Sequence, residues 1–196
     1  GEVVVLLGRN GAGKSTTMKS IMGLVAPASG RIAFRGSEIA GKQPFEIARL
    51  GLGYVPEDRR VFTELTVEEN LEVGRRPANP DAPLWTTDKL FALFPNLARM
   101  RDRPGSQMSG GEQQMLTIAR TLMGNPSLVL LDEPSEGLAP VIVEQMAKTI
   151  LDLKQQGLTV LLSEQNLHFA RTVADRALII EKGRIRFAGT MAELMA

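Results

Sequence analysis

Short apolar runs alternate along the chain with segments whose apolar residues have helical spacing. Residues Val3–Leu7 form a continuous, mostly β-branched apolar run, which is typical of a strand buried on both faces. Within Lys14–Leu24, by contrast, Met18, Ile21 and Met22 recur three or four positions apart and would share one face of a helix. This alternation predicts an α/β fold in which helices cover a mostly parallel sheet.

The remaining segments are assigned in the same way. Further strands are predicted at Arg31–Arg35, Leu52–Val55, Ser127–Leu131, Leu158–Leu162, Ala177–Ile180 and Arg184–Ala188. Further helices are predicted at Val67–Val73, Asp88–Phe94, Glu112–Met123, Val141–Gln155 and Leu167–Ala174. The proline-rich stretch 75–83 is a predicted loop, and Gly183 marks a hairpin turn between the last two strands.

The region from about 66 to 124 is mostly helical and interrupts the alternation of strands and helices. We therefore expect a single domain over 1–196, with a core formed by 1–65 and 125–196 and a helical subdomain inserted between them. The chain begins at Gly1 and runs directly into an apolar strand. From this start we expect that a β segment is missing at the N-terminal end.

The composition excludes several kinds of site. Hydrophobic residues make up 43% of the chain and charged residues 23%, as in ordinary soluble domains. The net charge of +1 provides no general attraction for nucleic acid, so no nucleic-acid partner is expected. The absence of cysteine rules out disulfides, thiolate metal ligands and cysteine nucleophiles. No apolar run approaches the ~20 residues that cross a bilayer as a helix.

The clearest chemical motif is "GRNGAGKST", residues 8–16, which fits the phosphate-loop pattern G-x-x-x-x-G-K-[ST]. It lies between the first predicted strand and the first predicted helix, where its mechanism requires it. Glycine permits backbone conformations in which amide groups point at phosphate oxygens, and the helix N-terminus adds a positive dipole. The alternative interpretation is a glycine-rich turn before a helix.

We therefore expect a P-loop NTPase fold with a RecA-like core that binds ATP and Mg²⁺. Lys14 should reach the β- and γ-phosphates, and Ser15 should ligate Mg²⁺. The expected nucleotide-binding residues of the loop are Gly8, Asn10, Gly11, Ala12, Gly13, Lys14, Ser15 and Thr16.

Two acids end the predicted strand within "LVLLDEPSEG", residues 128–137. In open α/β sheets, ligands bind at the carboxyl ends of the strands. We therefore expect Asp132 to hold Mg²⁺ and Glu133 to orient or deprotonate the attacking water. Taken alone, such a pair of acids is also common in a turn or a helix cap.

A second candidate anion site is "MSGGEQQ", residues 108–114. A hydroxyl group, free backbone amides and a helix N-terminus come together at Ser109, Gly110 and Gly111. One phosphate loop already serves one nucleotide, so this second site makes sense if it contacts the nucleotide of another subunit. That predicts a head-to-tail pair of subunits with two ATP molecules between them. A simple helix cap is the alternative.

These three motifs, in this order, make the chain resemble the nucleotide-binding domain of ABC ATPases over essentially its whole length. In that family the signature "LSGGQ" corresponds to Met108–Glu112, with a glutamate in the last place. The resemblance implies that Ser109 and Gly111 contact the γ-phosphate of the nucleotide bound by the partner subunit.

Longer stretches are similar to the ATPase subunit of branched-chain amino-acid importers that carries "VPE" and "EQN". They are "GRNGAGKSTTMKSIMGL", "GYVPEDRRVFTELTVEENL", "SGGEQQMLTIAR" and "LLDEPSEGLAP". This resemblance implies a peripheral place at the cytoplasmic face of the inner membrane. It also implies transmembrane permease subunits, a second ATPase subunit (a paralogue or a second copy) and, indirectly, a solute-binding protein as partners. Alternatives are a urea or short-amide importer, a soluble non-transport ABC ATPase, and a protein that binds ATP without hydrolysing it.

Besides the signature, the chain departs from the ABC pattern at three positions. Glu57 stands where most members have a glutamine, and the resemblance implies a ligand of Mg²⁺, a catalytic group or a conformational link to the membrane subunits. A solvated loop acid is the alternative for Glu57. Ala139 replaces a usual aspartate, which removes a side-chain contact across the subunit interface.

The third departure lies in "LSEQNLHFA", residues 162–170, where Gln165 takes the place of a histidine that contacts the γ-phosphate. Gln165 can donate a hydrogen bond to phosphate but cannot carry a proton. His168, the only histidine, is expected to be a surface or packing residue, and we interpret Tyr54 as structural. The expected catalytic residues are Glu133, Gln165 and Glu57, and the expected metal ligands are Ser15, Asp132 and Glu57.

Overall fold

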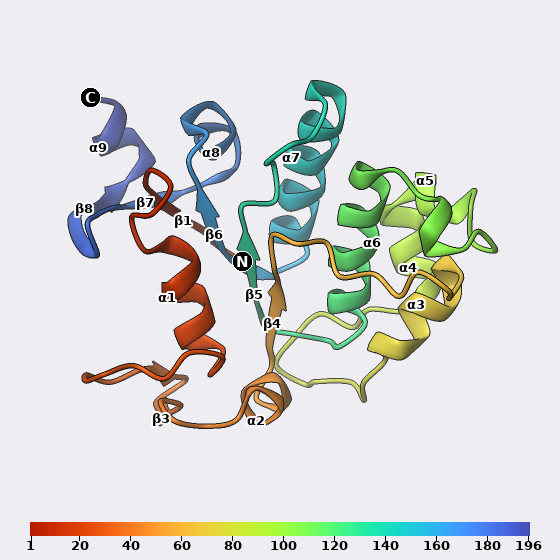
Figure 1. Cartoon of the computed structure of the whole chain (residues 1–196), viewed down its shortest axis with the longest axis horizontal. Helices are drawn as coiled ribbons and strands as arrows, with labels where there is room; N and C mark the ends of the chain where they lie inside the picture. Colours follow the sequence, from red (N-terminus) through yellow and green to blue (C-terminus); the bar gives the residue numbers. More distant parts are fainter.

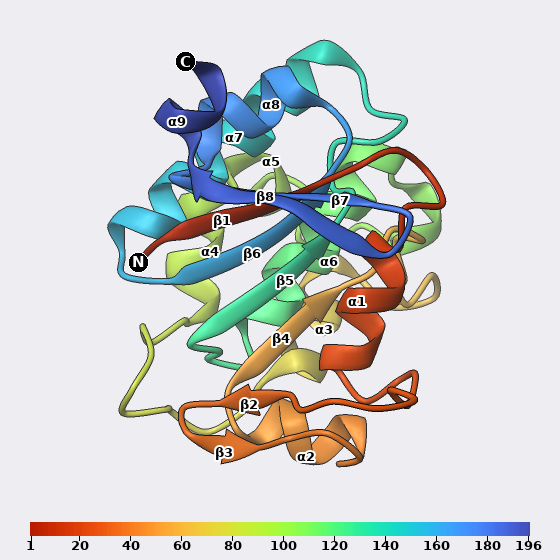
Figure 2. The same cartoon turned by 90° about the vertical axis from the view of Figure 1, so that its left-hand side faces the viewer.

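The computed structural model describes residues 1–196 and contains eight strands. They are β1 (Val3–Leu7), β2 (Ala33–Phe34), β3 (Ser37–Glu38), β4 (Leu52–Val55), β5 (Leu128–Asp132), β6 (Thr159–Glu164), β7 (Arg176–Glu181) and β8 (Arg184–Thr190). Six of them form one sheet in the order β4-β5-β6-β1-β7-β8, which is visible from one edge to the other in Figure 2. Within this sheet only the β7–β8 pair is antiparallel, and β2 and β3 form a separate antiparallel ribbon.

Helices cover both faces of this sheet (Figure 1). They are α1 (Lys14–Ile21), α2 (Pro44–Arg49), α3 (Val67–Gly74), α4 (Thr87–Leu93), α5 (Pro95–Ala98), the 3-10 helix η1 (Gly105–Gln107), α6 (Gly110–Leu122), α7 (Pro140–Gln155), α8 (Leu167–Val173) and α9 (Met191–Met195). Helix α1 packs on β5 and β6, while α7 packs on β6 and α8 on β1. None of the helices has the length and apolar character needed to cross a membrane.

The central strand β5 shows why its run is apolar at every position. Val129 and Leu131 belong to the large core cluster that also contains residues of α6, α7 and α8. Leu130 belongs instead to a smaller cluster with Met18 of α1. Successive side chains of a strand point to opposite faces, so a strand that is covered on both sides is apolar throughout. The predicted α/β fold with a mostly parallel, buried sheet is thereby confirmed.

The chain between β4 and β5 contains only helical elements among its regular structures, α3 to α6 with η1. Helix α3 packs on α6, and α6 in turn packs on β4. In Figure 1 this group lies beyond α7, on the side of the sheet away from α1. The division into a core and a helical subdomain at about 66–124 stays a prediction.

The predicted edge strand at Arg31–Arg35 is wrong. Only Ala33 and Phe34 are in a strand, and they pair with β3 rather than with the main sheet. The segment turns back at once, because Arg35 and Gly36 have φ of 50° and 78°. Helices α2, α5 and α9 were not predicted. They have six, four and five residues, too few for a helical period to show in the sequence.

Candidate functional site

The predicted phosphate loop connects β1 to α1, and its glycines meet different backbone requirements. Gly11 and Gly13 have φ of 79° and 111°, a region that residues with a side chain rarely adopt. Gly8 is constrained by space, because a Cβ there would lie 2.6 Å from the carbonyl oxygen of Ile180 in β7. The glycine spacing seen in the sequence is therefore required by the shape of the loop and by its neighbours.

A cavity of about 270 Å³ opens on this loop. Its lining consists of Asn10, Gly11, Gly13, Lys14, Ser15, Thr16, Glu57, Glu133 and Glu136. The structure thus brings the predicted loop residues together with two of the predicted acids, Glu57 and Glu133. Gly8 and Ala12 support the loop from outside this lining, and Ala12 is buried.

Lys14 is almost fully buried, with 3% of its surface exposed, yet its ammonium group is fully paired. Its Nζ donates to the carbonyl oxygens of Gly8 at 2.7 Å and Arg9 at 3.1 Å. It also forms an ion pair with Oε1 of Glu133 at 3.0 Å. An ammonium group has three hydrogens, so these three acceptors satisfy it and make its burial possible.

Asp132, at the end of β5, accepts hydrogen bonds from three hydroxyl groups. Its Oδ1 accepts from Ser15 at 3.0 Å and Ser163 at 2.6 Å, and its Oδ2 accepts from Tyr54 at 3.2 Å. The parallel register explains one of these contacts, because Asp132 lies opposite Ser163 of β6. Tyr54, which the sequence predicts to be structural, thus contacts the predicted metal ligand.

The oxygens of Ser15 and Asp132 are hard donors at hydrogen-bonding distance from each other, which suits a cation such as Mg²⁺. The chain contains no group of three or more histidine, cysteine, aspartate or glutamate side chains that could hold a metal ion. Magnesium sites in proteins usually combine one or two carboxylates with substrate phosphate oxygens and water.

Glu133 follows directly and is held in the left-handed region, with φ of 45°. Its backbone N–H donates to the carbonyl oxygen of Ser163 at 3.1 Å, and its Oε2 accepts from Nε2 of Gln165 at 3.4 Å. Two of the three predicted catalytic residues, Glu133 and Gln165, are thus in contact, while His168 is exposed on α8. A non-glycine residue in this conformation costs free energy, and such strain is concentrated at functional sites.

Glu136 and Glu164 are acids of this site that the sequence did not single out. Glu164 ends β6, is 1% exposed, and accepts backbone N–H groups of Ser135, Gln165 and Asn166. Burial raises its pKa, and these hydrogen bonds oppose the rise. An acid that ends an apolar strand beside β5 is a signal that could have identified Glu164.

Glu136 shares a hydrogen bond with the carboxyl group of Glu133. This contact, with some burial and the negative charges of Glu133, Glu57 and Glu164, raises the pKa of Glu136 to about 7. Burial would raise the pKa of Glu133 as well, but its hydrogen bonds with Glu136 and Lys14 and the charge of Lys14 outweigh burial and lower it. Glu136 is therefore the member of this acid pair with the higher pKa.

The segment 109–111 begins α6. Oγ of Ser109 accepts from the N–H of Glu112 at 3.4 Å, and Oε2 of Glu112 accepts from the N–H of Ser109 at 2.7 Å. These two hydrogen bonds form a capping box, so the local contacts within one subunit are those of a helix cap. None of the three residues Ser109, Gly110 and Gly111 lines the cavity on the phosphate loop. Any phosphate that they bind must therefore lie outside that cavity.

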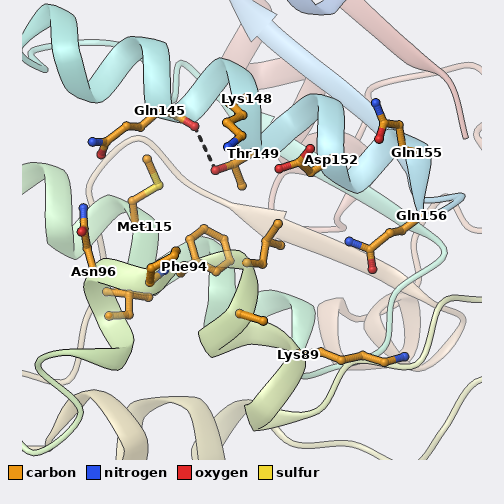
Figure 3. Close-up of a pocket in the computed structure, with 14 residues that line it drawn as sticks. Lys89, Phe94, Asn96, Met115, Gln145, Lys148, Thr149, Asp152, Gln155 and Gln156 are labelled. Carbon is orange, nitrogen blue, oxygen red and sulfur yellow. Dashed lines mark hydrogen bonds between the residues drawn. The ribbon is translucent and has the colours of Figure 1, made fainter.

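A larger cavity of about 780 Å³ lies between α7 and the α4–α5 pair (Figure 3). Figure 3 shows Phe94 and Met115 on one side and Lys148, Thr149 and Asp152 of α7 on the other. No predicted site residue lines it. This cavity is therefore separate from the predicted chemical groups, which lie at the carboxyl edge of the sheet.

A glycine-rich loop between a strand and a helix, a buried lysine and a carboxylate bonded to the serine of that loop define a P-loop nucleotide-binding protein. The family model described as "ABC transporter" matches residues 1–136. The chain therefore belongs to the ABC transporter family, as an ATPase subunit that binds and hydrolyses ATP.

Named relatives agree with this assignment. A high-affinity branched-chain amino acid transport ATP-binding protein, BraG of Pseudomonas aeruginosa, is 47% identical over 100% of this chain and 84% of its own length. The lipopolysaccharide export system ATP-binding protein LptB of Haemophilus influenzae is 39% identical over 99% and 81%. A solved ATP-binding cassette of an ABC transporter in its ADP conformation is 28% identical, with a TM-score of 0.81 over 98% of this chain and 81% of its own.

The raised pKa of Glu136 makes the stability of the nucleotide-free protein depend on pH. An acid whose pKa is higher in the folded state contributes stability at low pH and loses it as pH rises through the folded value, here about 7. Glu136→Gln cannot ionise and avoids this loss. Its melting temperature relative to wild type should therefore be higher at pH 8 than at pH 5.5.

The control is the same substitution in a Glu133→Gln background, where the carboxylate that chiefly raises the pKa is gone. There the difference between the two pH values should shrink. An equal melting-temperature difference at both pH values in the wild-type background would contradict the raised pKa of Glu136.

Proposed function

We propose that the chain is the ATP-binding and ATP-hydrolysing subunit of an importer for branched-chain amino acids. The observation that carries the hydrolytic part is the cluster of Lys14, Asp132 and Glu133 around the phosphate loop. The solute class is supported by the 47% identity with BraG, against 39% with the export protein LptB. A urea or short-amide importer is the alternative within the same class.

Binding of the triphosphate would use the loop amides, the N-terminus of α1 and Lys14. A phosphate oxygen can replace Glu133 as the third acceptor of Lys14, because the other two acceptors are backbone oxygens of the loop itself. This exchange would release the Glu133 carboxylate toward the attacking water. Gln165, already in contact with Glu133, would donate to a phosphate oxygen or to that water.

The residues present fit Mg²⁺, with Ser15 and Asp132 as its protein ligands. When bound, the ion neutralises charge on the β- and γ-phosphates. Glu57 lines the same cavity and belongs to the loop after β4. Strand β4 lies beside β5, which carries Asp132, on the side opposite β6. The side chain of Glu57 is exposed, and it would serve as a further ligand of Mg²⁺, as a catalytic group or as a conformational link to the membrane subunits.

The partner assignments follow from the segment 109–111, which lies outside the cavity of its own subunit. In a head-to-tail pair, Ser109 and Gly111 would contact the γ-phosphate of the nucleotide bound by a second ATPase subunit, which is identical or a paralogue. Closure of such a pair can move transmembrane permease subunits between two states. The subunit would then be peripheral, at the cytoplasmic face of the membrane, with a solute-binding protein as an indirect partner.

Glu133→Gln tests the hydrolytic assignment. Loss of the general base should lower the ATP turnover number by about 10²-fold or more, while ATP binding to the isolated chain persists. Lys14→Ala, which removes the buried cation, should instead abolish binding of ATP, as followed by a fluorescent ATP analogue. Normal turnover by Glu133→Gln would reject the base, and tight ATP binding by Lys14→Ala would reject the phosphate loop.

Gln165→Ala should lower ATP turnover by about tenfold, because a hydrogen bond to a charged group contributes about 1.5 kcal/mol. His168→Ala is the matched control, since this exposed side chain lies on α8 outside the cavity, and its turnover should equal wild type. The reverse pair of results would mean that the segment 162–170 has been aligned wrongly.

The solute is tested by uptake in cells that carry a deletion of the gene. Restoring the wild-type chain should restore uptake of labelled leucine, isoleucine and valine, and the Lys14→Ala chain should not. Restored uptake of urea or acetamide in place of leucine would select the alternative importer. If neither uptake depends on the chain, the transport assignment is rejected, whereas the ATPase assignment is judged by turnover alone.

A further inference from the structure

The loop between β4 and α3 is held by side chains of α3 and α6 at Arg60 and Phe62. Asn70, fully buried on α3, accepts from the N–H of Phe62 and donates to the carbonyl oxygen of the same residue. Arg120 of α6 stacks on the ring of Phe62, 4.8 Å from its centroid, and donates to the carbonyl oxygen of Arg60. The part of this loop nearest Glu57 is therefore held in one place relative to α6.

Arg59 extends from this fastened loop to two other segments. Its Nη2 donates to the carbonyl oxygen of Glu136 at 2.9 Å and would lie 3.4 Å from a Cβ on Gly137. Its Nη1 lies against the start of α6, because a Cβ added to Gly110 would collide with it. The backbone of Arg59 has φ of 42°, which is unfavourable for a residue with a side chain. One guanidinium group thus connects three segments.

Ordinary stabilisation does not explain this position. Arg59 takes part in none of the ion pairs of the chain. A cation beside the N-terminus of a helix is also disfavoured by the helix dipole. The side chain instead lies between the segment 109–111 and the loop 136–139, which it contacts at Gly110, Glu136 and Gly137. These are the two segments of one subunit that a head-to-tail partner would meet.

We propose that Arg59 is a positioning residue, which sets the spacing between the segment 109–111 and the loop 136–139 so that both reach the partner's nucleotide together. The inference rests on the proposed function for the pairing of subunits. It assigns to Arg59 no contact with the nucleotide of its own subunit, since it does not line the cavity on the phosphate loop.

The planar guanidinium group suits this role better than an ammonium group. Its nitrogens point in fixed, diverging directions, so one can bond Glu136 while the other packs on Gly110. A lysine would keep the charge but lose the fork. The lack of a side chain at Gly110 is the matching requirement, because any Cβ there would displace Arg59.

The test uses Arg59→Ala and Arg59→Lys, with Arg60→Ala as the matched control. Arg60 is the adjacent residue, and its side chain makes only an exposed pair with Asp58 at 2.8 Å. The transporter is purified from its native membrane through a tag on this chain, and kcat and KM for ATP are measured. The affinity of the isolated chain for ATP is measured separately.

Both Arg59 variants should lower kcat about tenfold, as expected for loss of a well-placed hydrogen bond. The affinity of the isolated chain for ATP should stay within about twofold, a change of ~0.4 kcal/mol, and Arg60→Ala should behave as wild type. Full kcat in Arg59→Ala would overturn the proposal, and full kcat in Arg59→Lys would overturn the role of the fork.

A second measurement separates positioning from folding. Gly110→Ala displaces Arg59 without removing it, so this single variant should lower kcat strongly. Adding Gly110→Ala to Arg59→Ala should lower kcat much less, because the contact is already lost. Additive effects would contradict a shared contact. A wild-type complex that binds ATP but does not hydrolyse it would instead contradict the proposed function. An inactive Arg59→Ala chain that no longer binds ATP would show that Arg59 is needed for folding, and would overturn the positioning role.

Discussion

The site depends on the buried ion pair between Lys14 and Glu133. Both side chains are removed from water, and a buried charge is tolerated only when it is paired and hydrogen-bonded. The phosphate loop supplies the remaining acceptors for Lys14 from its own backbone, and the sheet brings Glu133 within reach. The β1–β6 and β6–β5 registers align Leu7 with Glu164 and Ser163 with Asp132, so all three strands end at one edge. Everything else at the site is arranged around that edge.

Much of this arrangement could be predicted because it is encoded locally. One short stretch of sequence contains the strand Val3–Leu7, the glycines after it and the start of α1 at Lys14. The apolar pattern and the phosphate-loop motif can therefore be interpreted together. The same holds for the strand that delivers Asp132 and Glu133. In each case the order strand, motif, helix fixes which edge of a parallel sheet the side chains reach. The fold class and the phosphate-loop residues therefore did not require knowledge of long-range contacts.

The residues that were missed depend on contacts between segments distant in sequence. Tyr54 reaches Asp132 only because β4 lies beside β5, and Glu164 lies in the site only because β6 separates β5 from β1. A helical or strand period carries no information about that strand order. Glu136 and Arg59 are harder still, since each is defined by a contact with another loop residue, where sequence patterns are weakest. The failure at Arg31–Arg35 is of the opposite kind, since an alternating pattern was present but a turn at Gly36 ended it.

The balance of charge gives a physical reason for the division of the site between subunits. Within one chain, the hydrogen bond with Glu133, some burial and the negative charges of Glu133, Glu57 and Glu164 already raise the pKa of Glu136 to about 7. Lys14 is the only lysine in the lining of the phosphate-loop cavity, and a triphosphate adds several negative charges to it. A subunit can hold ATP there with the help of a divalent cation, but the transition state concentrates charge on the γ-phosphate. In the proposed pair, the amides of the segment 109–111 from the other subunit would meet that charge. Arg59 would then serve hydrolysis from a distance, by holding those amides at the correct spacing from the loop that follows Glu133.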